Sequence, residues 1–379
     1  FDHINKYLDR EIISTCRNQF PKEWTVIQLC KSYNPLALSS KKDDIVSFNT
    51  GISMALFKHA SVKTDLLMID LKKPQFLENV FEKAFKLNKM ITENMQEVSS
   101  TQTTAGQREA RERYLKATQE IGIFVQDIIN ILTSFFGPWI VALTGNFKSR
   151  KSLETENEIR KRVTEFLDMR PNNFDDYQQK LIHLVARRSD LLTHQQIFVA
   201  ITYILQDKPN FGYSDVDLND LYDHLTWIKQ EYKYEDTSTH PCILIVDELL
   251  DQLPLEMINT NQEFTRICSF TNLKRLWECN NHLVDNNGYV LSATANCQAI
   301  VNPDGSLTSM EDRLRKFYTY WLPSWKVFYR EKPTSDNYNE MLSQCDVLAY
   351  SGHGSGLNLL NEHGLKFKSK AVVFLFGCS

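Results

Sequence analysis

Two short apolar segments near the end of the sequence place the strongest constraint on its fold. The first is Asp346-Val-Leu-Ala-Tyr-Ser-Gly-His353-Gly354, and the second is Ala371-Val-Val-Phe-Leu-Phe-Gly377-Cys378-Ser379. Short runs rich in Val, Leu and Phe are typical of strands buried on both faces, and a glycine directly after such a run allows a tight turn. We therefore predict two parallel strands whose carboxyl ends carry His353 and Cys378.

A histidine and a cysteine at neighbouring strand ends indicate a catalytic site. Ligands of open α/β sheets bind at the carboxyl edge of the strands. A thiolate is the nucleophile in cysteine catalysis, and an imidazole beside it generates the thiolate and protonates the leaving group. Taken alone, a glycine-flanked histidine after a strand is more often a turn residue than a catalyst, and a cysteine that ends a strand is more often a packing residue. A metal site of His353, His363 and Cys378 is a further alternative, although no carboxylate that would orient the histidines is evident nearby. The paired placement favours a cysteine peptidase.

The C-terminal part of the sequence alternates strand-like runs with helix-like segments. Such alternation predicts an α/β fold in which helices cover a mainly parallel sheet. The strand-like runs are residues 242–247, 288–292, 325–329, 346–350 and 371–376, and the helix-like segments are residues 267–280, 310–320 and 335–344.

The N-terminal part begins with strand-like runs and continues with helical patterns. Apolar runs with β-branched residues predict strands at 24–29, 44–49 and 65–70. Apolar residues at steps of three and four then predict a long helix that Gly137-Pro138 ends, after a polar loop from Ser99 to Gly106. Further helices are predicted at about residues 74–97, 153–168, 174–188, 192–206 and 215–233.

A polar segment, Tyr232 to His240, separates the helical patterns from the alternating ones and is the predicted domain boundary. We expect a domain at residues 1–235, with a helical insertion at about 74–233, and a second domain at residues 236–379. Two domains also agree with the 379-residue length, which exceeds what one hydrophobic core normally supports.

Composition and charge narrow the functional classes. The net charge of −4 argues against a nucleic-acid module, which needs a clustered basic face. Basic residues do gather at 148–151 and 160–162, but Glu154, Glu156 and Glu158 lie between them, which predicts a solvated helix face. The eight cysteines have no regular spacing, so we expect neither a zinc ribbon nor a disulfide framework, and no cofactor. No membrane span or targeting sequence is expected, and we predict an intracellular protein.

Three groups of motifs resemble separase, the caspase-like protease that opens cohesin. Tyr350-Ser-Gly-His-Gly-Ser-Gly356 and Leu375-Phe-Gly-Cys-Ser379 are similar to its paired histidine and cysteine boxes. Ile243-Leu-Ile-Val-Asp247, followed by Leu253-Pro-Leu-Glu256, resembles its strand and Leu-Pro-aromatic-Glu segment, with Leu255 where the family usually has Trp. Tyr289-Val-Leu and Asn302-Pro-Asp-Gly-Ser-Leu307 resemble its strand and Asn-Pro-x-Gly-x-Leu turn.

This resemblance implies a caspase-like protease domain at residues 236–379, preceded by a mixed substrate-binding domain. It implies an endopeptidase with a His353–Cys378 dyad that cleaves the kleisin subunit of cohesin after arginine and releases sister chromatids at anaphase. The backbone amides of Gly354 and Cys378 would form the oxyanion hole, and we expect Glu256 to cap the helix that follows it. The implied inhibitor is securin, bound as a pseudosubstrate.

The resemblance also implies a cytoplasmic protein with access to chromosomes and spindle in mitosis. A helical-repeat regulatory region, fused or separate, is a possible further partner. The residues that select arginine are expected after Ser379, which leaves the protease domain incomplete on its C-terminal side. Two alternatives stay open at this point: another caspase-like peptidase with a different target, and a catalytically inactive caspase-like scaffold.

Overall fold

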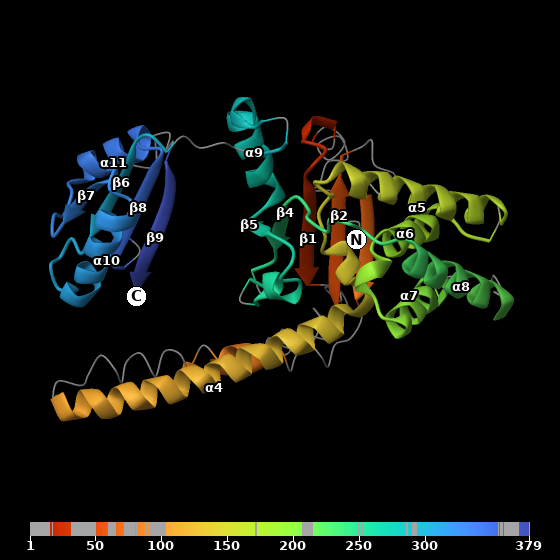
Figure 1. The fold of residues 1–379 in the computed structure, drawn as a ribbon, viewed down its shortest axis with the longest axis horizontal. Helices are drawn as coiled ribbons and strands as arrows, with labels where there is room; N and C mark the ends of the chain where they lie inside the picture. Colours follow the sequence, from red (N-terminus) through yellow and green to blue (C-terminus); the bar gives the residue numbers. More distant parts are fainter. Residues whose placement is uncertain are drawn as a thin grey trace, which may run out of the picture. The chain divides into compact units, whose positions relative to one another are not determined.

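The computed structural model divides the chain into two compact units (Figure 1). Unit 1 comprises Phe1–His282 and Asn286–Gly288, and unit 2 comprises Leu283–Asp285 and Tyr289–Ser379. The structure describes residues 16, 18–31, 51–59, 66–71, 80, 82–87, 89–90, 104–170, 173–206, 215–248, 250–251, 253–285, 287–289, 294–354, 356, 359 and 371–378.

Unit 1 is built on a mixed five-stranded sheet with the order β3-β2-β1-β4-β5. The strands β1 (Thr25–Lys31), β2 (Ile52–Lys58) and β3 (Leu66–Leu71) pair antiparallel, whereas β4 (Cys242–Val246) and β5 (Phe264–Ile267) continue the sheet in parallel from β1. The predicted boundary at residues 235/236 therefore does not coincide with the division between units. The ladder of β4 with β1 ties residues 242–267 to the N-terminal strands.

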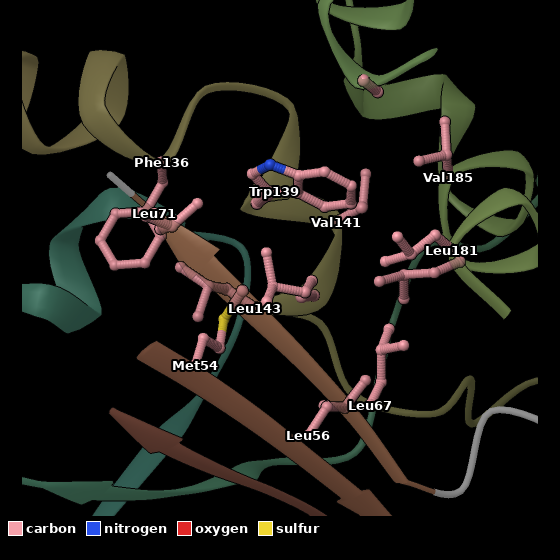
Figure 2. Packing of buried hydrophobic residues seen from close by; sticks show 14 of the residues in the cluster. Met54, Leu56, Leu67, Leu71, Phe136, Trp139, Val141, Leu143, Leu181 and Val185 are labelled. Carbon is pink, nitrogen blue, oxygen red and sulfur yellow. The ribbon is translucent and has the colours of Figure 1, made fainter. Parts of the chain in front are cut away.

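Alternate residues of this sheet face two different layers of helix. On β1, Ile27 and Leu29 belong to the large core that the helical insertion covers, while Val26 faces the opposite layer with Phe270 of α9 (Phe270–Asn280). This alternation is the two-residue period of a strand that is buried on both faces. Figure 2 shows the larger core, in which side chains of β2 and β3 meet the insertion; the labelled residues are Met54, Leu56, Leu67, Leu71, Phe136, Trp139, Val141, Leu143, Leu181 and Val185.

The helical insertion agrees with its predicted pattern. It contains α4 (Thr104–Phe136), the 3₁₀ helix η3 (Gly137–Ala142), α5 (Arg150–Asp168), α6 (Asp176–Arg187), α7 (His194–Gln206) and α8 (Asp215–Glu231). Helix α4 ends before Gly137, which has φ +52° as glycines after helices commonly do. The predicted loop at 99–106 is wrong for residues 104–106, which begin α4, and its residues 99–103 lie outside the described part of the chain.

The segment Thr118–Ala142 contradicts the expectation that no part of the chain has the length and apolar composition of a membrane span. Apolar side chains occur along most of this segment, from Ile121 onward. Ile128, Leu132, Phe135 and Phe136 are buried in the core of unit 1, whereas Ile123 is exposed. A core helix of a globular domain has the same composition, because its buried side needs the same apolar residues.

Unit 2 is built on a parallel four-stranded sheet with the order β7-β6-β8-β9, which confirms the predicted parallel arrangement. Its strands are β6 (Cys297–Val301), β7 (Lys326–Tyr329), β8 (Val347–His353) and β9 (Val372–Cys378). Helices α10 (Thr308–Trp321) and α11 (Ser335–Gln344) pack on opposite faces. On β8, Leu348 and Tyr350 pack with α11, whereas Ala349 packs with α10.

The strand order of unit 2 reverses between β6 and β8. From β6 the chain passes through α10 to β7 on one side, and it then returns through α11 to β8 and β9 on the other side. The carboxyl ends of β6 and β8 therefore form a topological switch point, where α/β folds commonly bind their ligands.

Several strand boundaries differ from the sequence-based predictions. Strands β5 and β6 were not predicted from the sequence. Strand β2 lies at residues 52–58, and the predicted strand at 44–49 is outside the described residues. Of the predicted strand at 288–292, residues 290–292 are also outside them.

Candidate active site

His353 and Cys378 are the last residues of two adjacent parallel strands. The ladder between β8 and β9 pairs His353 directly with Cys378, and the preceding glycines, Gly352 and Gly377, are also paired. The predicted placement of the two residues at neighbouring strand ends is thereby confirmed. Neighbouring strands lie about 4.8 Å apart, so the backbone brings these two positions into one site.

Gly377 permits a close approach of two backbone segments at this site. A Cβ atom at this position would lie 1.6 Å from the carbonyl oxygen of Gly354, a separation that no side chain tolerates. Gly354 itself has φ +67°, a left-handed conformation that glycine adopts without strain. The two glycines are thus required for β9 to pass under the turn that follows His353.

The buried side chain of Tyr350 holds this turn in place. The Tyr350 hydroxyl donates a hydrogen bond to the backbone carbonyl of His353, with an O···O distance of 2.7 Å. Added Cβ atoms at Gly352 and Gly356 would lie 2.8 Å from the Tyr350 hydroxyl and 3.0 Å from its ring, respectively. Because Tyr350 is only 2% exposed, it provides a rigid support for the turn between residues 352 and 356.

The loop after β6 forms the other wall of the site. The backbone N–H of Asn302 donates to the carbonyl of Ser351, with an N···O distance of 2.7 Å, which attaches the start of this loop to β8. Ser306, four residues later, places its Oγ 3.1 Å from Nε2 of His353. The imidazole of His353 is solvent-exposed, so this hydroxyl is close to an otherwise accessible ring.

A buried carboxylate holds the loop in place. Glu311 of α10, whose side chain is 3% exposed, accepts hydrogen bonds from Asn302 Nδ2 at 2.8 Å, Arg330 Nε at 2.7 Å and an Arg315 Nη at 2.9 Å. These hydrogen bonds, that from Arg330 first, lower the pKa of Glu311 to about 2. Glu311 is therefore ionised at neutral pH, and it holds Asn302 in the positive-φ conformation (φ +52°) from which the loop departs.

Glu256 lies in the first turn of the short 3₁₀ helix η5 (Leu255–Ile258), where it was predicted. Its carboxylate pairs there with the guanidinium of Arg266 on β5, whose Nη2 lies 2.8 Å from Glu256 Oε2. Arg266 also donates to the carbonyl oxygens of Asp251 and Leu253, at 2.6 Å each. A planar guanidinium with five donors is suited to this role, and it clamps the Leu-Pro-Leu-Glu segment to the sheet of unit 1.

The structure does not test the alternative metal site of His353, His363 and Cys378, because His363 lies outside the described residues. Among the residues that the structure describes, no group of three or more His, Cys, Asp or Glu side chains is arranged to hold a metal ion. The site as described contains an imidazole, glycine backbone and the polar loop at 302–307.

Ser306, Glu311 and Tyr350 were not predicted as members of the site. Ser306 lies within the Asn-Pro-Asp-Gly-Ser-Leu turn that resembles the separase family, but its proximity to His353 depends on the pairing of β6 with β8. Tyr350 belongs to the histidine box, yet its hydroxyl contact is invisible in the sequence. Glu311 reads as an ordinary first-turn acid of a helix.

Comparison with known proteins identifies relatives across most of the chain. The model of the separin protease domain matches residues 67–379. Separin of Mus musculus is 30% identical over 158 residues, which are 40% of this chain and 7% of the mouse protein. Separin of Saccharomyces cerevisiae is 25% identical over 228 residues, 56% of this chain and 13% of the yeast protein. Separin of Schizosaccharomyces pombe is 24% identical over 221 residues and is covered to 11%.

A crystal structure of the Saccharomyces cerevisiae separase–securin complex has a similar fold. It aligns with all of this chain at a TM-score of 0.67 and 15% sequence identity, and 26% of that structure's chain is covered. This similarity confirms the caspase-like α/β fold class. The chain spans only a small part, 7–13%, of the curated relatives named above.

Proposed function

The chain belongs to the separin family of cysteine proteases, and we propose that it carries the catalytic centre of an endopeptidase that uses a His353–Cys378 dyad. The observation that supports this proposal most strongly is the direct pairing of the two positions in the β8–β9 ladder. Paired positions of a parallel ladder project to the same face of a sheet, so we expect the imidazole and the thiol on one face.

The geometry suits acyl transfer through a thioester. His353 takes the proton of the Cys378 thiol, and the thiolate attacks the carbonyl carbon of the scissile peptide bond. When the C–N bond breaks, the imidazolium returns this proton to the leaving amine, and the acyl group stays on sulfur. Water then attacks the thioester and gives a proton to His353. The C–S bond breaks, the carboxylic acid is released, and the imidazolium returns this proton to the thiolate of Cys378.

The negative oxygen of the tetrahedral intermediate needs preorganised donors. We propose the backbone amides of Gly354 and Cys378 for this role. The close approach of Gly377 to Gly354 supports the proposal, because it fixes the two backbone segments against each other. Backbone donors held in this way need no rearrangement when charge develops on the oxygen.

Because this chain corresponds to only a small part of its relatives, we propose an activity for a whole protein that contains it. The substrate we propose is the kleisin subunit of cohesin, cleaved after arginine with an acidic residue shortly before it, at anaphase. Securin is the proposed inhibitor. This assignment is supported by the similar fold of the yeast separase that was crystallised in complex with securin. Cleavage after arginine requires carboxylates that pair with the guanidinium of the substrate. We also propose a cytoplasmic location with access to chromosomes in mitosis.

The test uses the full-length protein that contains this chain, with wild-type, Cys378→Ser and His353→Ala forms. We expect both variants to lose kleisin cleavage by several orders of magnitude while they still bind securin, because members of a catalytic unit fail together. A kleisin whose arginine is replaced by glutamate should resist the wild-type enzyme. Near-normal cleavage by Cys378→Ser would contradict the dyad, and a wild-type protein that labels with an arginyl acyloxymethyl ketone but spares kleisin would indicate a different target. Absence of labelling would indicate an inactive scaffold.

A further inference from the structure

The imidazole of His353 has a hydroxyl within hydrogen-bonding distance on a neighbouring loop. Ser306 Oγ lies 3.1 Å from His353 Nε2, at the switch point between the ends of β6 and β8. Both side chains are exposed, so the contact does not result from dense packing. A hydrogen bond between two exposed groups persists when the backbone holds both of them in position.

The backbone on each side of Ser306 is anchored to Asn302. The N–H of Gly305 donates to the carbonyl of Asn302 at 3.0 Å, and the N–H of Leu307 donates to the Asn302 side-chain oxygen at 2.9 Å. Asn302 is in turn held by Glu311 at 2.8 Å and is 1% exposed. The hydroxyl of Ser306 is thus mounted on a segment that is fixed before any substrate arrives.

The histidine side of the contact is anchored as well. Tyr350 holds the carbonyl of His353, and the ladder with β9 fixes its backbone. Two independently anchored groups that meet at 3.1 Å form a preorganised pair, and the ordering of such a pair costs little additional entropy.

We propose that Ser306 is a positioning residue that binds His353 through Nε2 and thereby leaves Nδ1 for proton exchange with the thiol and the leaving amine. The proposal rests on the function proposed above. A hydroxyl has two acceptor lone pairs, so Ser306 accepts a hydrogen bond from Nε2–H both in the neutral ring and in the imidazolium. In the neutral ring, a proton held on Nε2 leaves the lone pair of Nδ1 as the base.

The proton balance of the reaction is unchanged by this assignment. Nδ1 accepts the thiol proton and later delivers it to the leaving amine, while Nε2 keeps its proton throughout. Ser306 Oγ forms no covalent bond and transfers no proton. Its contribution is the orientation of the ring and the choice of tautomer.

The experiment compares Ser306→Ala and Ser306→Thr with Ser309→Ala, a matched serine truncation at an exposed position of α10, in the full-length protein. For an arginyl peptide substrate we expect Ser306→Ala to lower kcat about tenfold with KM within about twofold, as for the loss of one hydrogen bond that orients a catalytic group. Ser306→Thr keeps the hydroxyl and should restore most of kcat. Ser309→Ala should match the wild type, and the thermal midpoints should agree within about 2 °C.

A spectroscopic measurement separates positioning from any other cause. In ¹⁵N-histidine-labelled Cys378→Ser protein, with the His353 signals assigned by their loss in a His353→Gln variant, the fraction of the Nε2–H tautomer should fall in Ser306→Ala and recover in Ser306→Thr. An unchanged tautomer, or a kcat of Ser306→Ala equal to that of Ser309→Ala, would overturn the proposal. A complete loss of cleavage equal to that of His353→Ala would also overturn it, since Ser306 would then act directly in the reaction.

Failure of the proposed function has a different outcome. If the wild-type protein neither cleaves arginyl peptides nor labels at Cys378, the endopeptidase assignment falls. The tautomer measurement in Cys378→Ser protein does not require turnover, and a shift in Ser306→Ala would still support the contact through Nε2.

Discussion

The two units of the molecule each bury a glutamate among arginines, but the surroundings of the two carboxylates differ. In unit 1, Glu156 of α5 lies 3.1 Å from the Nε of Arg187 on α6, and their side chains are 11% and 6% exposed. Lys58 of β2 is buried nearby and donates to Asn146 Oδ1 at 3.0 Å. In this cluster the cations Arg187 and Lys58 are buried together with the anion.

In unit 2 the corresponding cations reach the surface. The side chain of Glu311 is 3% exposed, whereas those of Arg315 and Arg330 are 51% and 55% exposed. Arg315 also lies over the ring of Tyr329, with its guanidinium carbon 3.8 Å from the ring centroid. The carboxylate thus stays buried while its arginines retain much of their hydration.

This difference indicates different roles for the two clusters. The Glu156 cluster connects α5, α6 and β2, and burying its charges is costly unless all of them remain paired. It therefore supports the docking of the helical insertion on the sheet. The Glu311 carboxylate also accepts a hydrogen bond from Asn302, and Asn302 in turn holds the loop beside His353. We expect changes in the first cluster to affect folding and changes in the second to affect catalysis.

Apart from substitution of His353 or Cys378 themselves, the largest expected effect on activity comes from Gly377→Ala in unit 2. The added methyl group would meet the carbonyl oxygen of Gly354, so β9 or the turn after His353 must shift. Displacing a catalytic group by about 1 Å costs about a hundredfold in rate, and we expect at least this loss in kcat/KM. The measurement is peptide cleavage per folded molecule.

The control is Gly122→Ala in α4 of unit 1, where nothing lies within 4 Å of the added Cβ. An alanine in an exposed helical position should raise the free energy of unfolding by about 0.5–1 kcal/mol without changing activity. Full activity of Gly377→Ala would show that the backbone contact at the site is not needed.

The next effect is a loss of stability in Glu156→Gln. The substitution leaves the buried guanidinium of Arg187 without its anion, and breaking a buried ion pair in this way costs about 3–5 kcal/mol. Denaturant unfolding should report the loss, while kcat of the folded fraction stays unchanged. Glu158→Gln, at a position on the same helix that is 40% exposed, should alter stability little. Equal effects of the two substitutions would remove the contrast between the units.

A smaller effect is expected for Glu311→Gln, and it should lower activity more than stability, in contrast to Glu156→Gln. An amide lacks the charge that holds Arg330 and Arg315, so the Asn302–Leu307 loop should loosen and kcat should fall about three- to tenfold. Asp312→Asn, an exposed neighbour on α10, is the matched control. Peptide cleavage and thermal unfolding measured together decide the point, since a loss of stability with full activity would assign Glu311 to folding alone.

The last effect, which appears only away from neutral pH, is a pair of separate pH windows in stability. Burial lowers the pKa of Lys58 to about 7, from a usual value near 10.5. Between these values the unfolded chain binds more protons than the folded one, so stability should rise with pH. The pKa of Glu311 is lowered to about 2 from near 4.5, so its contribution is complete above pH 4.5 and is lost as the pH falls toward 2.

Each window can be removed by one substitution. Lys58→Met should flatten the rise in unfolding free energy above pH 7, and Glu311→Gln should flatten the acid slope. Lys151→Met, at an exposed lysine, should leave both slopes in place. A slope above pH 7 that persists in Lys58→Met would assign it to another group.

Local sequence patterns determined much of this protein. The helices of the insertion follow the spacing of their apolar residues, and the runs that end in His353 and Cys378 form adjacent parallel strands as predicted. These features depend on residues close together in the chain, where the period of 3.6 or 2 is set by the backbone itself. The histidine and cysteine boxes at these strand ends, which resemble those of a protease family, indicated the class of reaction.

Only the tertiary structure decided which distant residues share a site or a core. The sequence placed Glu156 on a solvated helix face with Glu154 and Glu158, yet the packing of α5 on the sheet leaves Glu156 only 9% exposed. Ser306 meets His353, 47 residues away in the sequence, because β6 pairs with β8. Such contacts follow from strand pairing across tens of residues, and no local period encodes them. The sequence by itself therefore determined most of the elements and the placement of His353 and Cys378 at adjacent strand ends, whereas the order of the strands decided what surrounds them.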